Sequence, residues 1–242
     1  ALLIVFWLSN QLQVRYSSIF NFDIKRVKEI FEVGLPAALE QVIFQIGITA
    51  FLILVAFYGT EAYAAYGIGV QILSFSIVIG FGFSIAGATL VGQHLGAKNE
   101  EQAKRAGWGA MRLSIISMTF FGVLITIFAE PLARYMIDND EVVRLTVIFI
   151  WLLGSMQPLM AIEFSLGGAL RGAGDTKTPL AITLTCLLFI RVFLAMIFFL
   201  LDARVEVIFS TLVADYVVKG FLYVARFRSD RWMNVLKTRE AD

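Results

Sequence analysis

The sequence predicts an all-α integral membrane protein, a bundle of six transmembrane helices preceded by the end of a further helix. Six apolar runs, each near or above the ~20 residues that a helix needs to cross a bilayer, occupy most of the 242 residues. Only 16% of the residues are charged and 59% are hydrophobic, whereas a soluble domain carries about 25% charged residues. Basic residues gather in alternate loops. These features together predict a chain whose main solvent is lipid.

The six predicted spanning helices follow one another with short connections, so no soluble domain separates them. They are expected at residues 36–58, 66–91, 108–129, 142–170, 179–201 and 205–224. Residues 1–33 are expected to hold the end of a truncated transmembrane helix and a cytosolic linker, residues 34–226 the six-helix lobe, and residues 227–242 a cytosolic tail. Any activity is therefore expected within the membrane or at its two faces.

The first residues differ from the later runs because their apolar stretch, Ala1–Leu8, is too short to span a membrane. It has no initiating methionine, basic leader or small-residue cleavage site, so we expect the end of a truncated helix and a missing upstream half. Residues 23–32 carry apolar side chains at the spacing of an amphipathic helix. We expect this helix to lie on the cytosolic surface, with an ordinary solvated linker as the alternative.

The distribution of lysine and arginine predicts how the bundle is oriented. Sixteen of these residues fall before the first run, after the second, after the fourth or at the end of the sixth, where Lys219 is included. Three fall in the other loops: Arg134, Arg144 and Arg204. Because basic loops stay in the cytoplasm, the first span is expected to run from inside to outside and the C-terminus to be cytoplasmic. The sequence thus predicts a multi-pass protein of the cell membrane, plasma or inner.

Ionisable side chains inside the apolar runs are the first candidates for function, because a charge in hydrocarbon is costly and usually faces the bundle interior. Glu40 in the first run and Glu163 in the fourth lie roughly 6 Å and 10 Å from the cytosolic ends at ~1.5 Å per residue. They can therefore share a cavity, and we interpret them as candidates to take up and release a proton or cation. The alternative is that each carboxylate is simply hydrated or bonded to the backbone.

Amide side chains accompany both carboxylates and are candidates to line the same cavity. Gln41 and Gln45 share one face of the first helix through their i, i+4 spacing, with Glu40 on its flank. Gln157 precedes Pro158 in the fourth run, and this proline is expected to kink the helix and free backbone carbonyls. The first and fourth helices are therefore expected to supply the polar groups of one cavity.

Arg191 and Asp215 are the other charged residues near the middle of apolar runs. They lie in the fifth and sixth runs at depths of roughly 18 Å and 16 Å from the cytosolic side, at ~1.5 Å per residue. Because the two helices run antiparallel, the sequence predicts an intramembrane ion pair between them. Such a pair is either a fixed structural clamp or a gate that opens during transport.

Three polar loops are interpreted as helix caps rather than binding sites. Asn99 begins a helix after the second run, and the polar cluster at residues 137–142 caps the fourth run from outside. Asp175, beside Arg171 and Thr176 in a predicted cytosolic turn, caps the helix of the fifth run. These residues are therefore assigned structural roles.

Several classes of chemistry find no support in the sequence. Cys186 stands alone, which offers neither a disulfide nor a metal cluster. No Walker loop, zinc-binding helix or nucleotide fingerprint is found, and the basic residues follow the membrane topology rather than a nucleic-acid surface. We therefore expect no catalytic residues, no metal, no nucleic-acid partner and no cofactor.

Four short motifs give the sequence a family resemblance. They are Gly-Leu-Pro at 34–36, Ala-Tyr-Gly-Ile at 65–68, Leu-Val-Gly-Gln at 90–93 and Leu-Arg-Gly-Ala-Gly-Asp-Thr-Lys at 170–177. Together they resemble the C-terminal half of a MATE multidrug and toxin extrusion transporter, over residues 8–226. Such transporters have twelve helices in two six-helix lobes, so the resemblance implies that this chain is the second lobe and that an N-terminal lobe is its partner.

The resemblance implies a secondary active antiporter, not an enzyme, that exports organic, often cationic compounds in exchange for H⁺ or Na⁺. Small organic cations or other amphipathic molecules, and the lipid bilayer, are then the expected partners. In the family, cation-binding carboxylates can occur at positions that correspond here to Phe44 and Met160. Glu40 and Glu163 each lie about one turn nearer the cytosol. Either this pair couples from its shifted position, or the ion site lies in the N-terminal lobe.

Two other functions stay open on the sequence. A lipid-linked oligosaccharide or polysaccharide flippase of the same superfamily would use a broad basic cavity, whereas the intramembrane charge here is mainly acidic apart from Arg191. An integral-membrane prenyl-transferring enzyme would need clustered aspartates at the cytosolic face to bind magnesium and diphosphate. The acidic cluster of this chain, Asp138, Asp140 and Glu141, falls on the predicted outer side.

Overall fold

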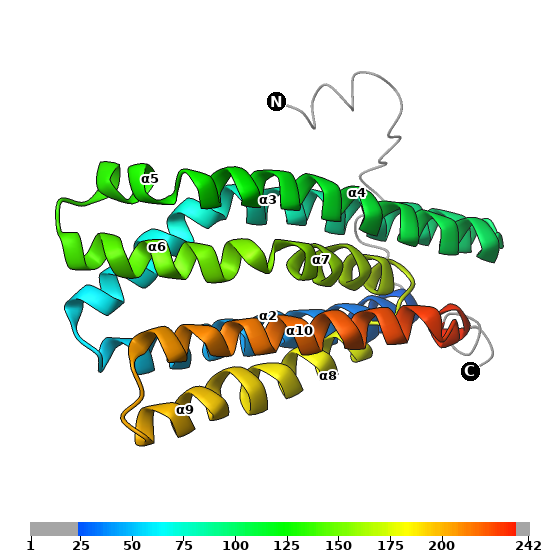
Figure 1. Cartoon of the computed structure of the whole chain (residues 1–242). Coiled ribbons are helices and arrows are strands. Elements are labelled where there is room, and N and C mark those ends of the chain that lie inside the picture. The colour runs from blue at the N-terminus through cyan, green and yellow to red at the C-terminus, as the bar shows by residue number, and fades with distance from the viewer. Residues whose placement is uncertain (1–23, 236–242) are drawn as a thin grey trace, which may run out of the picture. The chain divides into compact units, whose positions relative to one another are not determined.

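The computed structural model describes residues 24–235, and every regular element in this range is a helix (Figure 1). The chain divides into two units, one ending at Leu35 and one beginning at Pro36. The elements are α2 (Ile24–Ala56), α3 (Thr60–Gly96), α4 (Glu100–Ile127), α5 (Ala129–Met136), α6 (Asp140–Ser155), α7 (Gln157–Gly172), α8 (Lys177–Thr185), the π-helix η2 (Cys186–Val192), α9 (Phe193–Leu200), α10 (Val205–Arg228) and the 3₁₀ turn η3 (Arg231–Met233).

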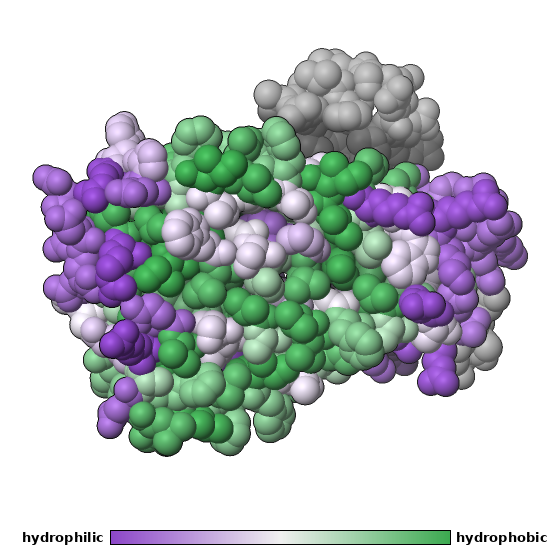
Figure 2. Space-filling model, viewed as in Figure 1, coloured by the Kyte–Doolittle hydropathy of each residue, from purple (hydrophilic) through white to green (hydrophobic). Residues whose placement is uncertain are grey.

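The described helices are long and apolar enough for a six-span bundle. Five candidate spans are Ile30–Ala56 in α2, all of α3, all of α4, the segment Lys177–Leu200 that joins α8, η2 and α9, and α10. The pair α6 and α7 makes a sixth when counted as one bent span. Figure 2 shows hydrophilic residues gathered at the two ends of the second unit and a hydrophobic band between them. The all-α membrane fold expected from the sequence is therefore confirmed.

The fourth span is broken, not merely kinked. Helices α6 and α7 meet at Met156 with a bend of 54°. Pro158 lies in the first turn of α7, where a residue without an N–H leaves no helical hydrogen bond unmade. The proline expected to kink the fourth span thus begins its second half.

The short amphipathic helix expected at residues 23–32 is not a separate element. The structure has one helix from Ile24 to Ala56, with Pro36 inside it. Gly34 and Pro36 disfavour helix between the two segments, but Pro36 lies inside the helix without ending it. The apolar stretch Ala1–Leu8 and the predicted tail beyond residue 235 lie outside the described residues.

Asparagine side chains begin two of the long helices, as the sequence indicates. Asn99 Oδ1 accepts a hydrogen bond from the backbone N of Gln102 at 3.1 Å, at the start of α4. Asn139 Oδ1 accepts from the backbone N atoms of Glu141 and Val142, both at 3.1 Å, at the start of α6. Each cap satisfies donors that the first helical turn leaves free.

Replacing Asn139 with alanine is expected to lower the free energy of unfolding by about 1 kcal/mol, because two N–H groups of α6 lose their acceptor. Thermal unfolding of the purified full-length protein measures the change. The exposed neighbour Asp138→Ala is the control and should unfold as the parent does. Equal melting temperatures for the two variants would show that the cap contributes nothing measurable.

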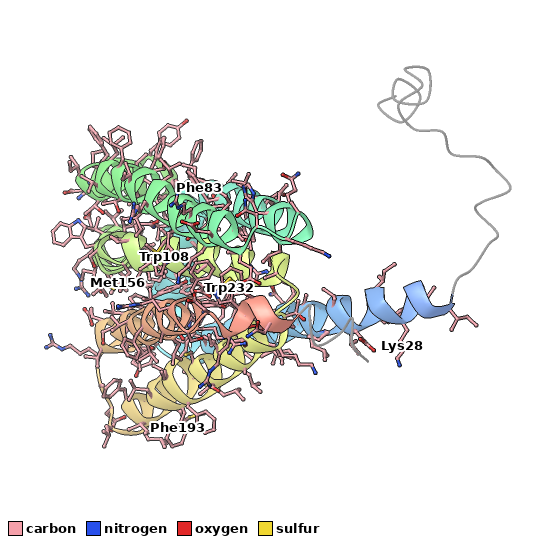
Figure 3. All side chains as sticks on the ribbon, turned by 90° about the vertical axis from the view of Figure 1, so that its right-hand side faces the viewer. Lys28, Phe83, Trp108, Met156, Phe193 and Trp232 are labelled. Carbon is pink, nitrogen blue, oxygen red and sulfur yellow. The ribbon has the colours of Figure 1, made fainter. Side chains whose placement is uncertain are left out.

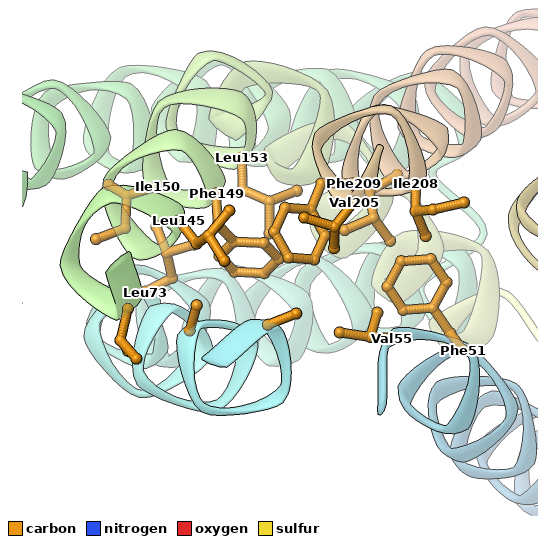
Figure 4. Packing of buried hydrophobic residues seen from close by; sticks show 14 of the residues in the cluster. Phe51, Val55, Leu73, Leu145, Phe149, Ile150, Leu153, Val205, Ile208 and Phe209 are labelled. Carbon is orange, nitrogen blue, oxygen red and sulfur yellow. The ribbon is translucent and has the colours of Figure 1, made fainter. Parts of the chain in front are cut away.

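Two aromatic clusters pack inside the bundle. One surrounds Phe149, whose ring packs edge-on against Tyr66 at 5.2 Å and against Phe209 at 5.1 Å between centroids. Figure 4 labels Phe149 and Phe209. The other surrounds Phe227, which packs against Trp108 at 5.2 Å and stacks on Trp232 at 4.6 Å (Figure 3 labels both tryptophans). Their members come from different helices, so burial of these rings holds the bundle together.

Candidate functional site

A cavity of about 430 Å³ lies inside the second unit, within the hydrophobic part of the bundle. Residues of α2, α3, α6, α7, α8, η2 and α10 line it, and most of them are apolar or aromatic. The aromatic members are Phe44, Tyr66, Phe81, Phe149, Phe164, Tyr216 and Tyr223. A pocket of this size and character suits a small organic molecule.

Glu40 and Glu163, the two coupling candidates, both line this cavity. Glu40 comes from α2 and Glu163 from α7, so the bundle brings together two residues that are 123 positions apart. Their side chains are 13% and 18% exposed. The structure thus places the pair in one cavity, and their part in ion coupling stays a prediction.

Glu40 is bound to two neighbouring helices. Arg171 Nη1 of α7 lies 3.1 Å from Glu40 Oε1 and 3.2 Å from Oε2, and the Thr183 hydroxyl of α8 donates to Oε1 at 3.3 Å. Arg171 Nη2 also donates to Ser84 Oγ of α3 at 3.2 Å. Arg171 is therefore a cavity residue, and the interpretation of it as part of a cytosolic turn is wrong. Its long side chain reaches back from the end of α7 into the bundle.

Glu163 has its own basic partner, Lys219 of α10. Lys219 Nζ lies 3.2 Å from Glu163 Oε1 and 3.4 Å from Asp215 Oδ2, and the lysine side chain is fully buried. The prediction that Lys219 belongs to the cytosolic basic residues is therefore wrong. The signal for its true position is its i, i+4 spacing from Asp215, which puts the two side chains on one face of α10.

Arg191 and Asp215 form the ion pair that the antiparallel fifth and sixth spans predict. Arg191 Nη2 lies 2.5 Å from Asp215 Oδ2, and both side chains are almost completely buried. Arg191 lies on the π-helical segment η2, whose wider turn interrupts the regular helix in the middle of this span. The pair joins η2 to α10, and through Lys219 it joins Glu163 as well.

The charges in and around the cavity balance. Three carboxylates, Glu40, Glu163 and Asp215, are paired with three basic side chains, Arg171, Lys219 and Arg191. The expectation of a mainly acidic interior apart from Arg191 is therefore wrong. Two basic residues placed near helix ends by sequence position in fact turn inward, because buried carboxylates without partners would be very costly.

Of the three glutamines expected to line the cavity, only one does so among the described residues. Gln41 lines the cavity. Gln45 is exposed and is not among the lining residues, because five positions along a helix place it about 140° around from Glu40 at 3.6 residues per turn. Gln157 is also outside the cavity: its side-chain oxygen accepts a hydrogen bond from Ser76 Oγ at 2.6 Å, inside the α3–α7 packing. The expectation that Gln45 and Gln157 line the cavity is therefore wrong.

Phe44 and Met160, the positions to which the resemblance assigns the family's cation-binding carboxylates, also lie at the cavity. Phe44 and Met160 both contribute to its wall. The ring centroid of Phe44 lies 5.7 Å from Lys219 Nζ, close enough for a cation–π contact. Glu40 and Glu163 therefore lie in the same cavity as Phe44 and Met160.

Asp175 has the structural role assigned to it. Its Oδ1 accepts from the backbone N of Thr178 at 3.3 Å at the start of α8, and its Oδ2 accepts from Arg226 Nη2 of α10 at 2.6 Å. The outer acidic cluster is likewise engaged in surface ion pairs. Arg134 Nη1 lies 2.9 Å from Asp140 Oδ1, and Arg144 Nη2 lies 2.7 Å from Glu141 Oε1.

Comparison with known sequences identifies relatives of this chain. The MatE family model matches residues 36–197. The probable multidrug resistance protein NorM of Thermotoga maritima is 32% identical over 214 residues, which is 85% of this chain and 44% of that protein. The multidrug resistance protein NorM of Aliivibrio fischeri is 30% identical over 152 residues, 62% of this chain and 33% of that protein. The chain thus spans less than half the length of these relatives.

Solved structures show the same fold. A crystal structure of MATE in complex with MaL6 has a TM-score of 0.82 and 18% identity, and covers 98% of this chain and 54% of that one. The MATE transporter ClbM in complex with Rb⁺ has a TM-score of 0.80 and 21% identity, and covers 90% of this chain and 52% of that one.

The match to the family model extends over all of α3 to α8 and η2 and most of the membrane-spanning part of α2. It includes both coupling candidates and the basic partner of Glu40. Since the prenyl-transferring enzyme was an alternative to this family, it is no longer supported. The chain belongs to the MatE family of MATE transporters and is a multi-pass membrane protein, not an enzyme.

Proposed function

We propose that this chain is one six-helix lobe of a secondary active antiporter that exports organic, often cationic compounds in exchange for H⁺ or Na⁺. An N-terminal lobe of the same transporter is its proposed partner. The observation that carries the proposal is the cavity in which Glu40 and Glu163 are each held by a basic side chain. The names of the relatives as multidrug resistance proteins support export of several compounds.

The walls of the cavity suit amphipathic organic molecules. Seven aromatic rings line it, and rings bind flat apolar groups and organic cations without requiring one fixed geometry. Of the three carboxylates, Glu163 is the most exposed and is therefore the most available to a substrate cation. A loosely specific site with one accessible anionic group is what export of varied cationic compounds requires.

Exchange follows from competition for the same carboxylate. When Glu163 binds a coupling ion, it no longer attracts an organic cation, and the reverse holds when the cation is bound. Lys219 pairs with Glu163 when neither is bound, so that no charge is left uncompensated in the membrane. Alternating access then requires that the coupling ion at Glu163 favours one conformation of the transporter and that the organic cation favours the other.

The same proposal places the transporter in the cell membrane, plasma or inner, with its C-terminus in the cytoplasm. The excess of lysine and arginine in alternate loops supports this orientation. The connections α3–α4 and α7–α8 and the chain after α10 share one end of the bundle, at the right of Figure 1. That end is the proposed cytoplasmic side.

Glu163→Gln in the full-length transporter is expected to reduce gradient-driven ethidium efflux from proteoliposomes at least tenfold, because glutamine keeps the shape of the side chain but cannot exchange a coupling ion. Glu40→Gln is expected to have the same direction and a smaller effect, since Glu40 is held by Arg171 and Thr183. Efflux is followed under imposed proton or sodium gradients, with equal protein in the vesicles.

Glu101→Gln is the matched control, because Glu101 also pairs with an arginine, Arg105, at 2.6 Å, but on the exposed face of α4. It should transport as the parent does. If both cavity variants keep parental efflux, the coupling site lies outside this lobe and the proposal fails for this chain.

A lipid-linked oligosaccharide flippase is the second candidate, and the structure makes it stronger than the sequence does. Three basic side chains, Arg171, Lys219 and Arg191, line or border the cavity, where a diphosphate would need them. An assay of lipid-linked oligosaccharide translocation separates the two functions. Translocation without any gradient-driven dye efflux in the parent would favour the flippase.

A further inference from the structure

The ammonium group of Lys219 occupies a position that has the surroundings of a cation-binding site. Its ammonium group lies 3.2 Å from Glu163 Oε1 and 3.4 Å from Asp215 Oδ2, with no exposed surface. Two aromatic rings complete its surroundings, with the centroid of Tyr216 at 5.6 Å and that of Phe44 at 5.7 Å from Nζ. Two carboxylates and two ring faces are groups that bind a free cation as well. Here a side chain of the protein itself occupies the position.

The groups around Lys219 leave no unbalanced negative charge for a second cation. They come from α7, α10, η2 and the opposite wall of the cavity, and the charged or titratable ones are Glu163, Asp215, Tyr216, Tyr223, Arg191, Cys186, Glu40 and Arg171. Asp215 is shared between Lys219 and Arg191, and Glu40 is neutralised by Arg171. The phenol and thiol groups supply no charge at neutral pH.

A proton and a sodium ion make different demands on this site. Sodium gives up water when it enters a buried site, and only several oxygen ligands with net negative charge make up for that loss. To obtain them at Glu163 it would have to displace an ammonium group that is covalently tethered next to the carboxylate. A tethered group competes at an effective concentration of about millimolar or above. A proton instead bonds covalently to one carboxyl oxygen and needs no ligand shell.

We propose that Lys219 reserves Glu163 for protons by acting as the resident cation of the Glu163–Asp215 site and excluding Na⁺ from it. In its transport consequence this inference rests on the proposed function, since it selects H⁺ over Na⁺ as the ion coupled through this lobe. Proton uptake neutralises Glu163 and frees the ammonium of Lys219, which then has Asp215 as its remaining carboxylate partner. Removal of the lysine charge opens the position to an alkali cation.

Binding of ²²Na⁺ to the purified full-length transporter in detergent tests the occupancy without any transport. We expect Glu163→Gln to bind as much ²²Na⁺ as the parent, because Lys219 already excludes the ion from Glu163. Lys219→Met is expected to bind about one additional Na⁺ per molecule, and this addition should disappear in Lys219→Met/Glu163→Gln. Lys219→Arg keeps the tethered charge and should match the parent.

Three results would overturn the inference: parental ²²Na⁺ binding that is lost in Glu163→Gln, no additional binding in a folded Lys219→Met variant, or an addition that persists in the double variant. If Lys219→Met does not fold, the comparison of the parent with Glu163→Gln decides. Equal ²²Na⁺ binding by these two proteins supports the inference, and weaker binding by Glu163→Gln refutes it. Efflux driven by a proton gradient but not by a sodium gradient in the parent is the expected transport result. Absence of all efflux would count against the proposed function only, because the binding result stands by itself.

Discussion

Gly168→Ala is expected to abolish most of the folded protein, although it adds only one methyl group. Gly168 lies on α7 against the backbone of α3, and a Cβ at this position would overlap the carbonyl oxygen and Cα of Ser84. Backbone atoms cannot rotate away as a side chain can, so the two helices have to separate. We expect a loss of at least the ~1–3 kcal/mol of an overpacked core, even though alanine favours helix by about 1 kcal/mol.

A second backbone contact between α3 and α7 lies one turn later, and the two contacts also position residues of the cavity. A Cβ at Gly172 would overlap the carbonyl oxygen of Ala88, so two small residues four positions apart let α3 and α7 touch along their backbones. Ser84, at the first contact, accepts the hydrogen bond from Arg171 that holds this arginine beside Glu40. Separation of the helices therefore disturbs the cavity as well as the packing.

Melting temperature and the yield of monodisperse protein measure the effect of Gly168→Ala. Gly109→Ala is the matched control, since a Cβ at Gly109 in α4 meets nothing within 4 Å in the described part of the chain. The control should equal or slightly exceed the stability of the parent. A Gly168→Ala protein as stable as the control would refute the close backbone contact of α3 and α7.

Among substitutions that remove one charge from the described helices, Asp215→Asn is expected to lower the free energy of unfolding the most. Asparagine leaves Arg191 without its carboxylate and removes one of the two that hold Lys219. A buried charge that loses its partner typically costs about 3–5 kcal/mol. The variant should therefore unfold at a much lower temperature than the parent, or fail to accumulate in the membrane.

The control for Asp215→Asn is the same substitution at a surface ion pair. Asp230 lies 2.6 Å from Lys104, with both side chains about two-fifths exposed, so Asp230→Asn should cost no more than about 1 kcal/mol. Arg191→Met added to Asp215→Asn removes the uncompensated guanidinium and should restore much of the stability. Equal melting temperatures for the two aspartate variants would contradict the buried charge network.

The fold was predictable from the sequence because length and hydropathy decide it. Six apolar runs could be placed without knowledge of any contact, and the depths of Arg191 and Asp215 follow from a constant rise per residue. The break at Met156 was only partly visible, since a proline shows that a helix is disturbed and not how far it bends. Local rules thus predict elements and depths.

The charge network could not be predicted in the same way, because it depends on how helices rotate about their axes. Arg171 and Lys219 lie near helix ends in the sequence, and the positive-inside rule assigns such residues to the cytoplasm. Only the packing of α2, α7 and α10 shows that both side chains turn inward to carboxylates. Gln45 was expected in the cavity because it shares a face with Gln41, but it lies about 140° around the helix from Glu40 and is exposed.

Competition between protons and a permanent organic cation tests exchange at Glu163 most directly. Binding of radiolabelled tetraphenylphosphonium to the purified full-length transporter in detergent is measured from neutral to mildly acidic pH. In the parent and in Glu101→Gln the affinity should fall as the pH is lowered, because a protonated Glu163 no longer attracts the cation. In Glu163→Gln the affinity should be lower at neutral pH and change little with pH. The same pH dependence in the parent and Glu163→Gln would contradict exchange at Glu163 and place coupling elsewhere in the transporter.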